Sequence, residues 1–126
     1  MPKTQKQQLG IKGEDAAAEF LKLKGHSIAS RNFRFQKSEL DIISLIDDVL
    51  VISEVKSYQK PPLGAAEYRV DKKKQRQIIL GTYGFLAENS QFENTAVRFD
   101  VIVVNFSEYP AQIIQYEGAF WDEDGW

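Results

Sequence analysis

Apolar residues near the start of the chain recur at the spacing of a helix. Between residues 9 and 24, one side of that helix would carry Leu9, Gly13, Ala17, Phe20 and Leu21. Gly25 follows directly, and glycine is a common helix stop. The pattern therefore predicts an amphipathic helix over residues 9–24.

Three β-rich runs follow this helix. Extended segments are predicted over residues 27–35, 39–46 and 49–57, and only Asp47-Asp48 separates the last two. So short a gap between runs rich in β-branched residues favours a hairpin.

The second half of the chain predicts a loop, a helix and two more strands. Residues 58–70 contain Pro61-Pro62 and Gly64, which are typical of a loop. Asp71 can cap the helix, whose packed side is predicted to carry the apolar residues and glycines Ile79, Gly81, Tyr83, Gly84 and Leu86. Strands are predicted over residues 97–105, the most buried run, and over 112–116, after a turn at Tyr109-Pro110.

The predicted order is α-β-β-β-α-β-β, in a single domain over residues 1–126. The helix between the third and fourth strands is long enough for a right-handed crossover, which makes those two strands parallel neighbours. The expected fold class is α/β, with a mixed sheet flanked by helices.

Composition excludes several kinds of chemistry. The 126 residues include no cysteine and one histidine, which excludes disulfide scaffolds, thiol nucleophiles, iron–sulfur clusters and His-rich metal sites. No apolar run approaches the roughly 20 residues of a membrane helix, and the first residues lack the apolar core of a signal peptide. We therefore expect a cytoplasmic protein without a membrane partner.

Charge is unevenly divided along the chain, although the net charge is only −2. Residues 1–37 carry eight Lys/Arg and three Asp/Glu, residues 38–55 carry five acids and no base, and residues 56–76 carry seven bases and two acids. Basic stretches on both sides of an acidic cluster can form a phosphate-binding face. An ordinary solvated surface explains the same charges equally well.

The hairpin brings acidic residues together. If Asp47-Asp48 is the turn, the register places Asp41 opposite Glu54 and Glu39 opposite Lys56. Carboxylates that face each other across two strands have Cβ atoms about 4.5–5.5 Å apart and destabilise a sheet. A divalent cation is the simplest compensation.

Mg²⁺ or Mn²⁺ held by Asp41 and Glu54, with Lys56 orienting the attacking water, would support metal-assisted phosphodiester hydrolysis. The alternative is a set of surface ion pairs between Lys56 and the two glutamates. Against that alternative, the charges lie at the end of an apolar face that carries Ile43, Leu45, Leu50 and Ile52.

Other polar residues are weaker candidates. Glu14 borders the apolar stripe of the first helix and could reach the sheet, although a first-turn acid also interacts favourably with the helix dipole. Gln75 lies on the apolar side of the predicted second helix, and Lys74 lies beside it. Either side chain could point toward the sheet, although a basic run such as Lys72–Lys74 is more often simply exposed to solvent.

Two further residues are assigned no functional role. Asp100 is predicted to be structural, paired with Arg98 on the same strand face. His26 follows a helix-ending glycine and is predicted to be exposed.

The hairpin SELDIISLIDDVLVISEVK resembles the Asp…Glu-x-Lys signature of the PD-(D/E)XK nuclease superfamily. Five fragments in the same order are similar to the YraN-like family of small bacterial proteins: GIKGEDAAAEFLKLKGHSIASRNFRF, SELDII, EVK, KKKQRQ and RFDVIVV. The similarity covers nearly the whole chain.

This resemblance implies a restriction endonuclease-like fold and a Mg²⁺- or Mn²⁺-dependent site. It implies Asp41 and Glu54 as metal ligands, Lys56 as the catalytic lysine and Glu14 as a further catalytic residue. Lys74 and Gln75 match a Lys-Gln of the family at the second helix. The predicted nucleic-acid contacts are Arg34, Lys72, Lys74 and Gln75. Ser38 stands where the family has glycine, and residues 57–59 lack a basic residue often found after Glu-x-Lys.

The leading hypothesis is an endonuclease that hydrolyses phosphodiester bonds in DNA, including branched or junction DNA, with DNA favoured over RNA. The alternative is a catalytically weak nucleic-acid-binding or adaptor protein on the same fold. A third is an interaction module that uses Phe120, Trp121 and Trp126 as its contact surface. A homodimer would suit a junction-cutting enzyme, but no residue pattern specifies one.

Overall fold

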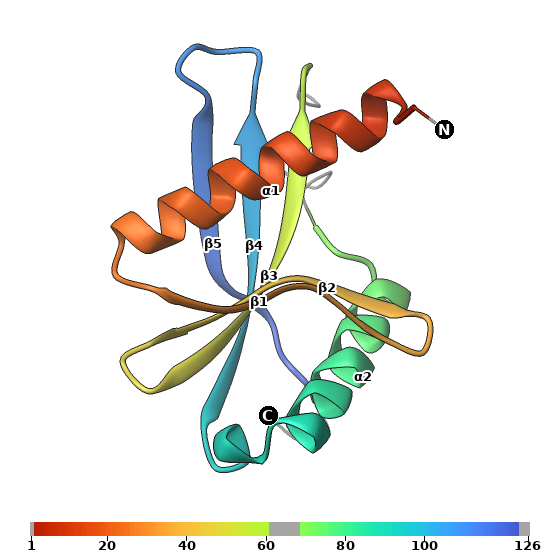
Figure 1. Cartoon of the computed structure of the whole chain (residues 1–126), viewed down its shortest axis with the longest axis vertical. Helices are drawn as coiled ribbons and strands as arrows, with labels where there is room; N and C mark the ends of the chain where they lie inside the picture. Colours follow the sequence, from red (N-terminus) through yellow and green to blue (C-terminus); the bar gives the residue numbers. More distant parts are fainter. Residues whose placement is uncertain (1, 61–68, 124–126) are drawn as a thin grey trace.

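The computed structural model describes residues 2–60 and 69–123, and the predicted order of elements is confirmed (Figure 1). The elements in chain order are α1 (Gln5–Leu23), β1 (Ser27–Phe35), β2 (Ser38–Ile46), β3 (Val49–Tyr58), α2 (Lys72–Glu88), the short 3-10 helix η2 (Ser90–Phe92), β4 (Ala96–Asn105) and β5 (Gln112–Phe120). Pro61, Pro62 and Gly64 of the predicted loop lie outside the described residues.

The five strands form one mixed sheet in the order β1-β2-β3-β4-β5. Strands β3 and β4 are parallel, as the predicted crossover requires, and the other pairs are antiparallel. The sheet is strongly twisted: in Figure 1, β1 and β2 run across the view while β4 and β5 run along it.

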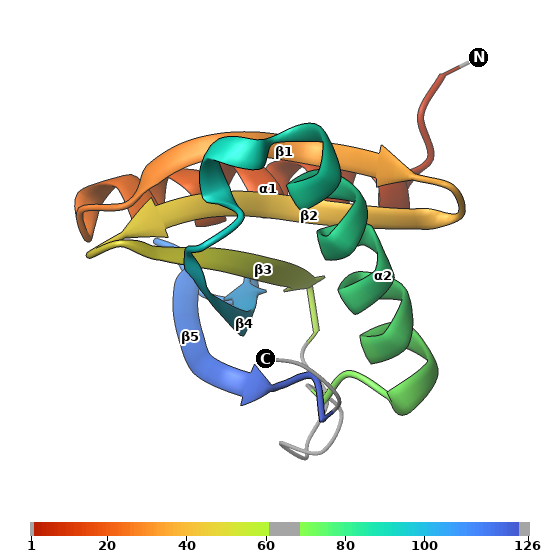
Figure 2. The same cartoon turned by 90° about the horizontal axis from the view of Figure 1, so that it is seen from below.

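Each helix covers one face of the sheet and a different part of it. Helix α1 packs mainly on β3, whereas α2 packs on β1 and β2 (Figure 2). The core on the α2 side includes Leu40, Ile43, Leu50 and Ile52, and the core on the α1 side includes Ala17, Leu21, Ile42 and Ile102. No helix among the described residues is long and apolar enough to cross a membrane.

The predicted hairpin is confirmed. Asp47 and Asp48 have φ angles of 49° and 62°, as in the type I′ turn that joins antiparallel strands with a two-residue loop. The register has the predicted pairs from Ile46–Val49 to Ile42–Ser53.

Glycines let the helices approach the sheet closely. A Cβ on Gly13 would lie 2.7 Å from the Cβ of Ser57 in β3, and a Cβ on Gly84 would overlap the ring of Phe35. The predicted role of Gly84 in close packing is confirmed. Gly13 brings α1, and with it the neighbouring Glu14, against the sheet.

Two element boundaries differ from the prediction. Helix α1 begins four residues earlier, because Thr4 and Gln7 form a capping box that stabilises a polar first turn. Strand β5 continues to Phe120 rather than ending at residue 116, because it passes through an irregularity at Gly118, whose φ angle is 59°.

Two side-chain predictions are wrong. Tyr83 lies on the exposed side of α2, because the buried side is set by Phe85, which packs on the rings of Phe33 and Phe92. His26 is only 5% exposed, because its Nδ1 atom lies 2.9 Å from the hydroxyl of Ser44, which satisfies the buried ring.

Candidate active site

Strand β2 separates from β3 at Asp41. Leu40 packs in the α2-side core and Ile42 in the α1-side core, whereas regular alternation would put both on one face. The ladder between β2 and β3 ends at Ile42, and Asp41 Oδ2 accepts a hydrogen bond of 2.9 Å from the backbone N–H of Val55. A carboxylate thus takes the place of the lost strand partner.

The predicted register includes two further pairs, Asp41 with Glu54 and Glu39 with Lys56, and the ladder between β2 and β3 ends before both of them. Glu39 does not face Lys56, because β2 has left β3 by that point. Instead, Glu39 pairs with Arg34 in the β1–β2 ladder, and their side chains approach to 3.3 Å.

The carboxyl groups of Asp41 and Glu54 lie close enough together for each to shift the pKa of the other. The Glu54 side chain is only 13% exposed. Burial, followed by the charge of Asp41, raises the pKa of Glu54 to about 8, and burial also raises the pKa of Asp41. Because the pKa of Glu54 is about 8, the metal-free pair carries one proton between its two carboxyl groups in most molecules at pH 7.

Two lysines lie beside the acidic pair. Lys74 Nζ, from the first turn of α2, is 3.8 Å from Glu54 Oε1. Lys56, two residues after Glu54 on β3, donates a hydrogen bond of 2.7 Å from Nζ to the backbone carbonyl of Arg69. The side-chain amide of Gln75 donates a hydrogen bond of 2.8 Å to the backbone carbonyl of Val70. The segment that leads into α2 is therefore tied to the acidic pair.

Glu14 approaches Asp41 from α1, as predicted. Its side chain is 17% exposed and lies 3.7 Å from Arg31. Burial, followed by the charge of Asp41, raises the pKa of Glu14 to about 7, against the opposing effects of Arg31 and a hydrogen bond with Asn32.

The other predicted contact residues lie around this centre. Arg34 is exposed and lines a hollow of about 410 Å³ together with Glu14, Arg31 and Lys3. Lys72 is exposed and pairs with Glu123 at 3.2 Å, on the other side of α2 from Lys74. Arg31, which lies beside Glu14, is a site residue that no sequence motif marks, and the basic surplus of residues 1–37 is its one signal in the sequence.

Within residues 2–60 and 69–123, no three His, Cys, Asp or Glu side chains converge closely enough to hold a metal ion by themselves. A cation at the acidic pair would therefore have two carboxylate ligands and would complete its shell with water and substrate oxygens. Mg²⁺ is often bound in that way, by one or two carboxylates plus phosphate. The donor set fits such an ion.

Asp100 has the structural role predicted for it. Its fully buried carboxylate accepts hydrogen bonds from Arg98 at 2.9 and 3.0 Å, from the side-chain amide of Gln115 at 2.9 Å and from the N–H of Gly118 at 3.0 Å. The carboxylate thereby holds the irregular part of β5.

The sequence matches the model of "Uncharacterised protein family UPF0102" over residues 13–104. A UPF0102 protein of Treponema denticola is 38% identical over 124 residues, covering 90% of this chain and 95% of its own. A UPF0102 protein of Syntrophotalea carbinolica is 38% identical over 122 residues, which cover 97% of this chain and 98% of the relative. A UPF0102 protein of Clostridium perfringens is 39% identical over 98 residues, which cover 78% of this chain and 80% of the relative. The matched range of the family contains Glu14, Arg31, Asp41, Glu54, Lys56 and Lys74.

Proposed function

We propose that this chain, which belongs to the uncharacterised protein family UPF0102, is a divalent-metal-dependent endonuclease that hydrolyses phosphodiester bonds in DNA. The observation that carries the proposal is the buried pair of Asp41 and Glu54 with Lys56 two residues further on the same strand. This arrangement agrees with the resemblance of the hairpin to the Asp…Glu-x-Lys signature of PD-(D/E)XK nucleases.

Asp41 and Glu54 would hold Mg²⁺ or Mn²⁺ in place of the proton that the pair carries. When bound, the cation supplies positive charge that polarises the scissile phosphate. Asp41 is fixed for this role by the N–H of Val55, so its second oxygen keeps one direction toward Glu54.

The remaining residues act on water, protons and the phosphate. Lys56 can orient the attacking water and stabilise negative charge on the phosphate, and its ammonium group is held by the carbonyl of Arg69. Glu14, with a pKa near 7, can take up or release a proton at neutral pH.

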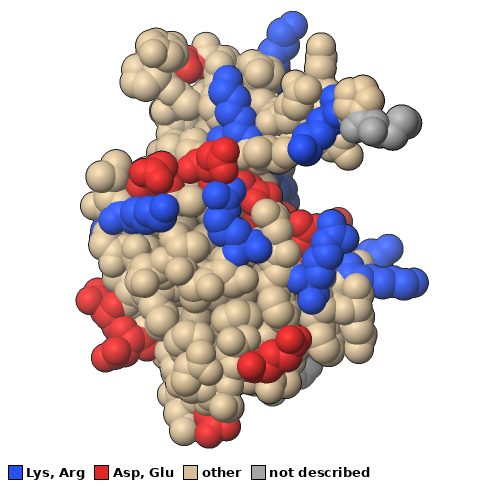
Figure 3. Space-filling model, in the orientation of Figure 1, with Lys and Arg blue, Asp and Glu red and all other residues tan. Residues whose placement is uncertain are grey.

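Basic side chains flank the acidic residues on two sides. Arg31 and Arg34 lie on the Glu14 side, and Lys74 lies on the Glu54 side. Figure 3 shows Lys and Arg side chains next to a band of acidic ones across this face of the molecule. Such a rim suits a phosphate backbone that passes over the acidic pair.

DNA binding should weaken steeply with salt, because every phosphate that a lysine or arginine neutralises releases counterions. Arg34→Gln should reduce the slope of log K against log salt by about one. Lys22→Gln is the matched control, since Lys22 pairs with Glu19 near the far end of α1, and should leave the slope unchanged. Affinity that is flat from low to moderate salt would contradict a role in binding nucleic acid.

Cleavage of linear, flapped and four-way DNA in the presence of Mg²⁺ or Mn²⁺ tests the proposal directly. Lys56→Met should abolish cleavage and keep Mn²⁺ binding, because the lysine is not a metal ligand. A parent protein that binds DNA but neither binds Mn²⁺ nor cleaves any substrate would overturn the proposal and favour the adaptor alternative.

A further inference from the structure

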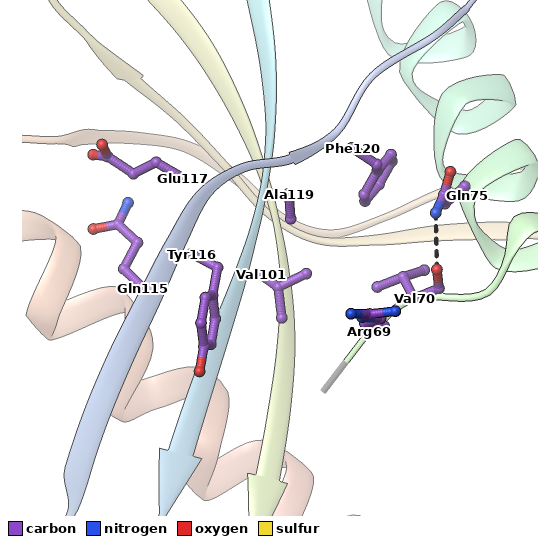
Figure 4. A pocket seen from close by; sticks show the side chains of 9 residues that line it. All are labelled: Arg69, Val70, Gln75, Val101, Gln115, Tyr116, Glu117, Ala119 and Phe120. Atoms are coloured by element: carbon purple, nitrogen blue, oxygen red, sulfur yellow. Dashed lines mark hydrogen bonds between the residues drawn. The ribbon is translucent and has the colours of Figure 1, made fainter. Parts of the chain in front are cut away.

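A second feature of the same region is a pocket of about 590 Å³ on the α2 side of the sheet (Figure 4). Val101 of β4 and Phe120 of β5 supply apolar surface, and Tyr116 forms a wall. Arg69 and Gln75 line the opposite side, toward α2. The volume lies within the range of about 300–1,000 Å³ that is usual for small-ligand pockets.

The pocket is built by the irregular end of β5. Gly118 adopts a left-handed conformation there, and its N–H is held by the buried carboxylate of Asp100. Figure 2 shows that the end of β5 curves toward α2. Beyond it, Asp122 accepts a hydrogen bond of 2.8 Å from the hydroxyl of Tyr83, and Glu123 pairs with Lys72. The segment after β5 and helix α2, which lie on opposite sides of the pocket, are therefore joined by these two contacts.

The pocket adjoins the acidic pair through the segment of residues 69–75. The backbone carbonyl of Arg69 accepts a hydrogen bond from Lys56, and that of Val70 accepts one from the side-chain amide of Gln75. Lys74, next to Gln75, contacts Glu54. A ligand in the pocket would thus lie against the segment that also holds Lys56 and Lys74 near Glu54.

The chemistry of the lining favours a planar, partly polar ligand whose negative charge lies at Arg69, because Glu117, the acidic residue of the lining, is paired with Arg98 at 3.4 Å. Tyr116 is 38% exposed and faces the pocket from the centre of a strand, where an aromatic ring can stack on a heterocycle. Gln75 supplies an amide for hydrogen bonds to the edge of a base, and a guanidinium such as that of Arg69 matches the geometry of a phosphate.

We propose that this pocket binds an unpaired nucleobase of the DNA substrate, stacked on Tyr116, with its phosphate on Arg69. The assignment rests on the proposed nuclease function and deepens it. A base inside a duplex remains stacked and paired, and it enters a protein pocket only at the cost of unpairing. The substrate would therefore be DNA with unpaired bases, as in single strands, flaps and open junctions.

Fluorescence anisotropy with a labelled 12-nucleotide DNA strand, and with the same sequence as a blunt duplex, tests the proposal. Both titrations are done in EDTA, so that cleavage plays no part. The parent should bind the single strand more tightly than the duplex. Tyr116→Ala should weaken binding of the single strand by about ten- to a hundredfold, the range for loss of one stacked base, and should change duplex binding less than about twofold.

Tyr109→Ala is the matched control, because Tyr109 is fully exposed and lies outside this pocket. Ala119→Phe, which adds a ring at an exposed position in the lining, should reproduce the loss without removing any existing contact. Equal binding of the single strand by the parent and both pocket variants would overturn the proposal, as would tighter binding of the duplex by the parent. Binding through Tyr116 without cleavage in Mn²⁺ would refute the nuclease function and leave the pocket assignment intact.

Discussion

Asp41→Asn is expected to leave the metal-free protein at least as stable as the parent and to abolish both Mn²⁺ binding and cleavage. The amide has the size of the carboxylate, and its oxygen can still accept the hydrogen bond from the N–H of Val55. The substitution removes the negative charge that, after burial, raises the pKa values of Glu54 and Glu14. It therefore lowers the free-energy cost of holding these two groups protonated in the folded state. Cleavage should fall by about a thousandfold or more, as when a group that stabilises transition-state charge is lost.

Asp41→Ala is the informative control, because it removes the charge and also the hydrogen bond. The N–H of Val55 then has no acceptor from residue 41, which should destabilise the protein by about 1–3 kcal/mol relative to Asp41→Asn. Thermal melts of the parent and both variants, in EDTA and in Mn²⁺, measure these effects. Loss of stability in Asp41→Asn, together with no Mn²⁺ shift in the parent, would show that the pair is only structural.

The hairpin and the crossover could be predicted because local rules determine them. A gap of two aspartates admits only a two-residue turn, and that turn fixes the register as far as Ile42 and Ser53. The length of the segment between the third and fourth strands likewise makes β3 and β4 parallel. The ladder ends one pair before Asp41 and Glu54, and the two residues still approach each other because Asp41 accepts a hydrogen bond from the N–H of Val55, the residue next to Glu54.

The point where β2 leaves β3 could not be predicted, since it depends on which core each side chain joins. Leu40 and Ile42 are similar residues at alternate positions, and nothing local indicates that they pack on opposite faces. His26 was misjudged for a related reason, because its partner Ser44 lies 18 residues away on β2.

The pocket beside the acidic pair was hidden in the sequence. The predicted strand spans residues 112–116, whereas β5 continues through Gly118 to Phe120. The strand continues because Asp100, on the neighbouring strand, binds the N–H of Gly118. Asp100 was predicted to pair with Arg98, but its role in shaping the end of β5 becomes visible only when the register of β4 and β5 is known.

The metal-free protein is expected to lose stability between pH 7 and pH 8, by about 1 kcal/mol per pH unit. The pKa of Glu54 is about 8 in the folded protein, against 4.5 for an ordinary glutamate. In this interval the folded state therefore binds more protons than the unfolded state, and unfolding becomes easier as pH rises. Below pH 6.5, His26 makes the stability rise with pH, because burial lowers its pKa in the folded protein.

Urea unfolding at pH 7, 7.5 and 8, in EDTA and in saturating Mg²⁺, measures this dependence. With Mg²⁺ the decline should become smaller, because the cation replaces the proton of Asp41 and Glu54, while Glu14, with a pKa near 7, still loses its proton in this interval. Calorimetric titrations in buffers of different ionisation enthalpy should then show that Mg²⁺ binding at pH 7 releases about one proton. Asp41→Asn should also flatten the decline in EDTA, because it removes the charge that helps to raise the pKa of Glu54. A parent protein whose metal-free stability rises from pH 7 to pH 8 would contradict a protonated acidic pair, and with it the exchange of a proton for a metal ion.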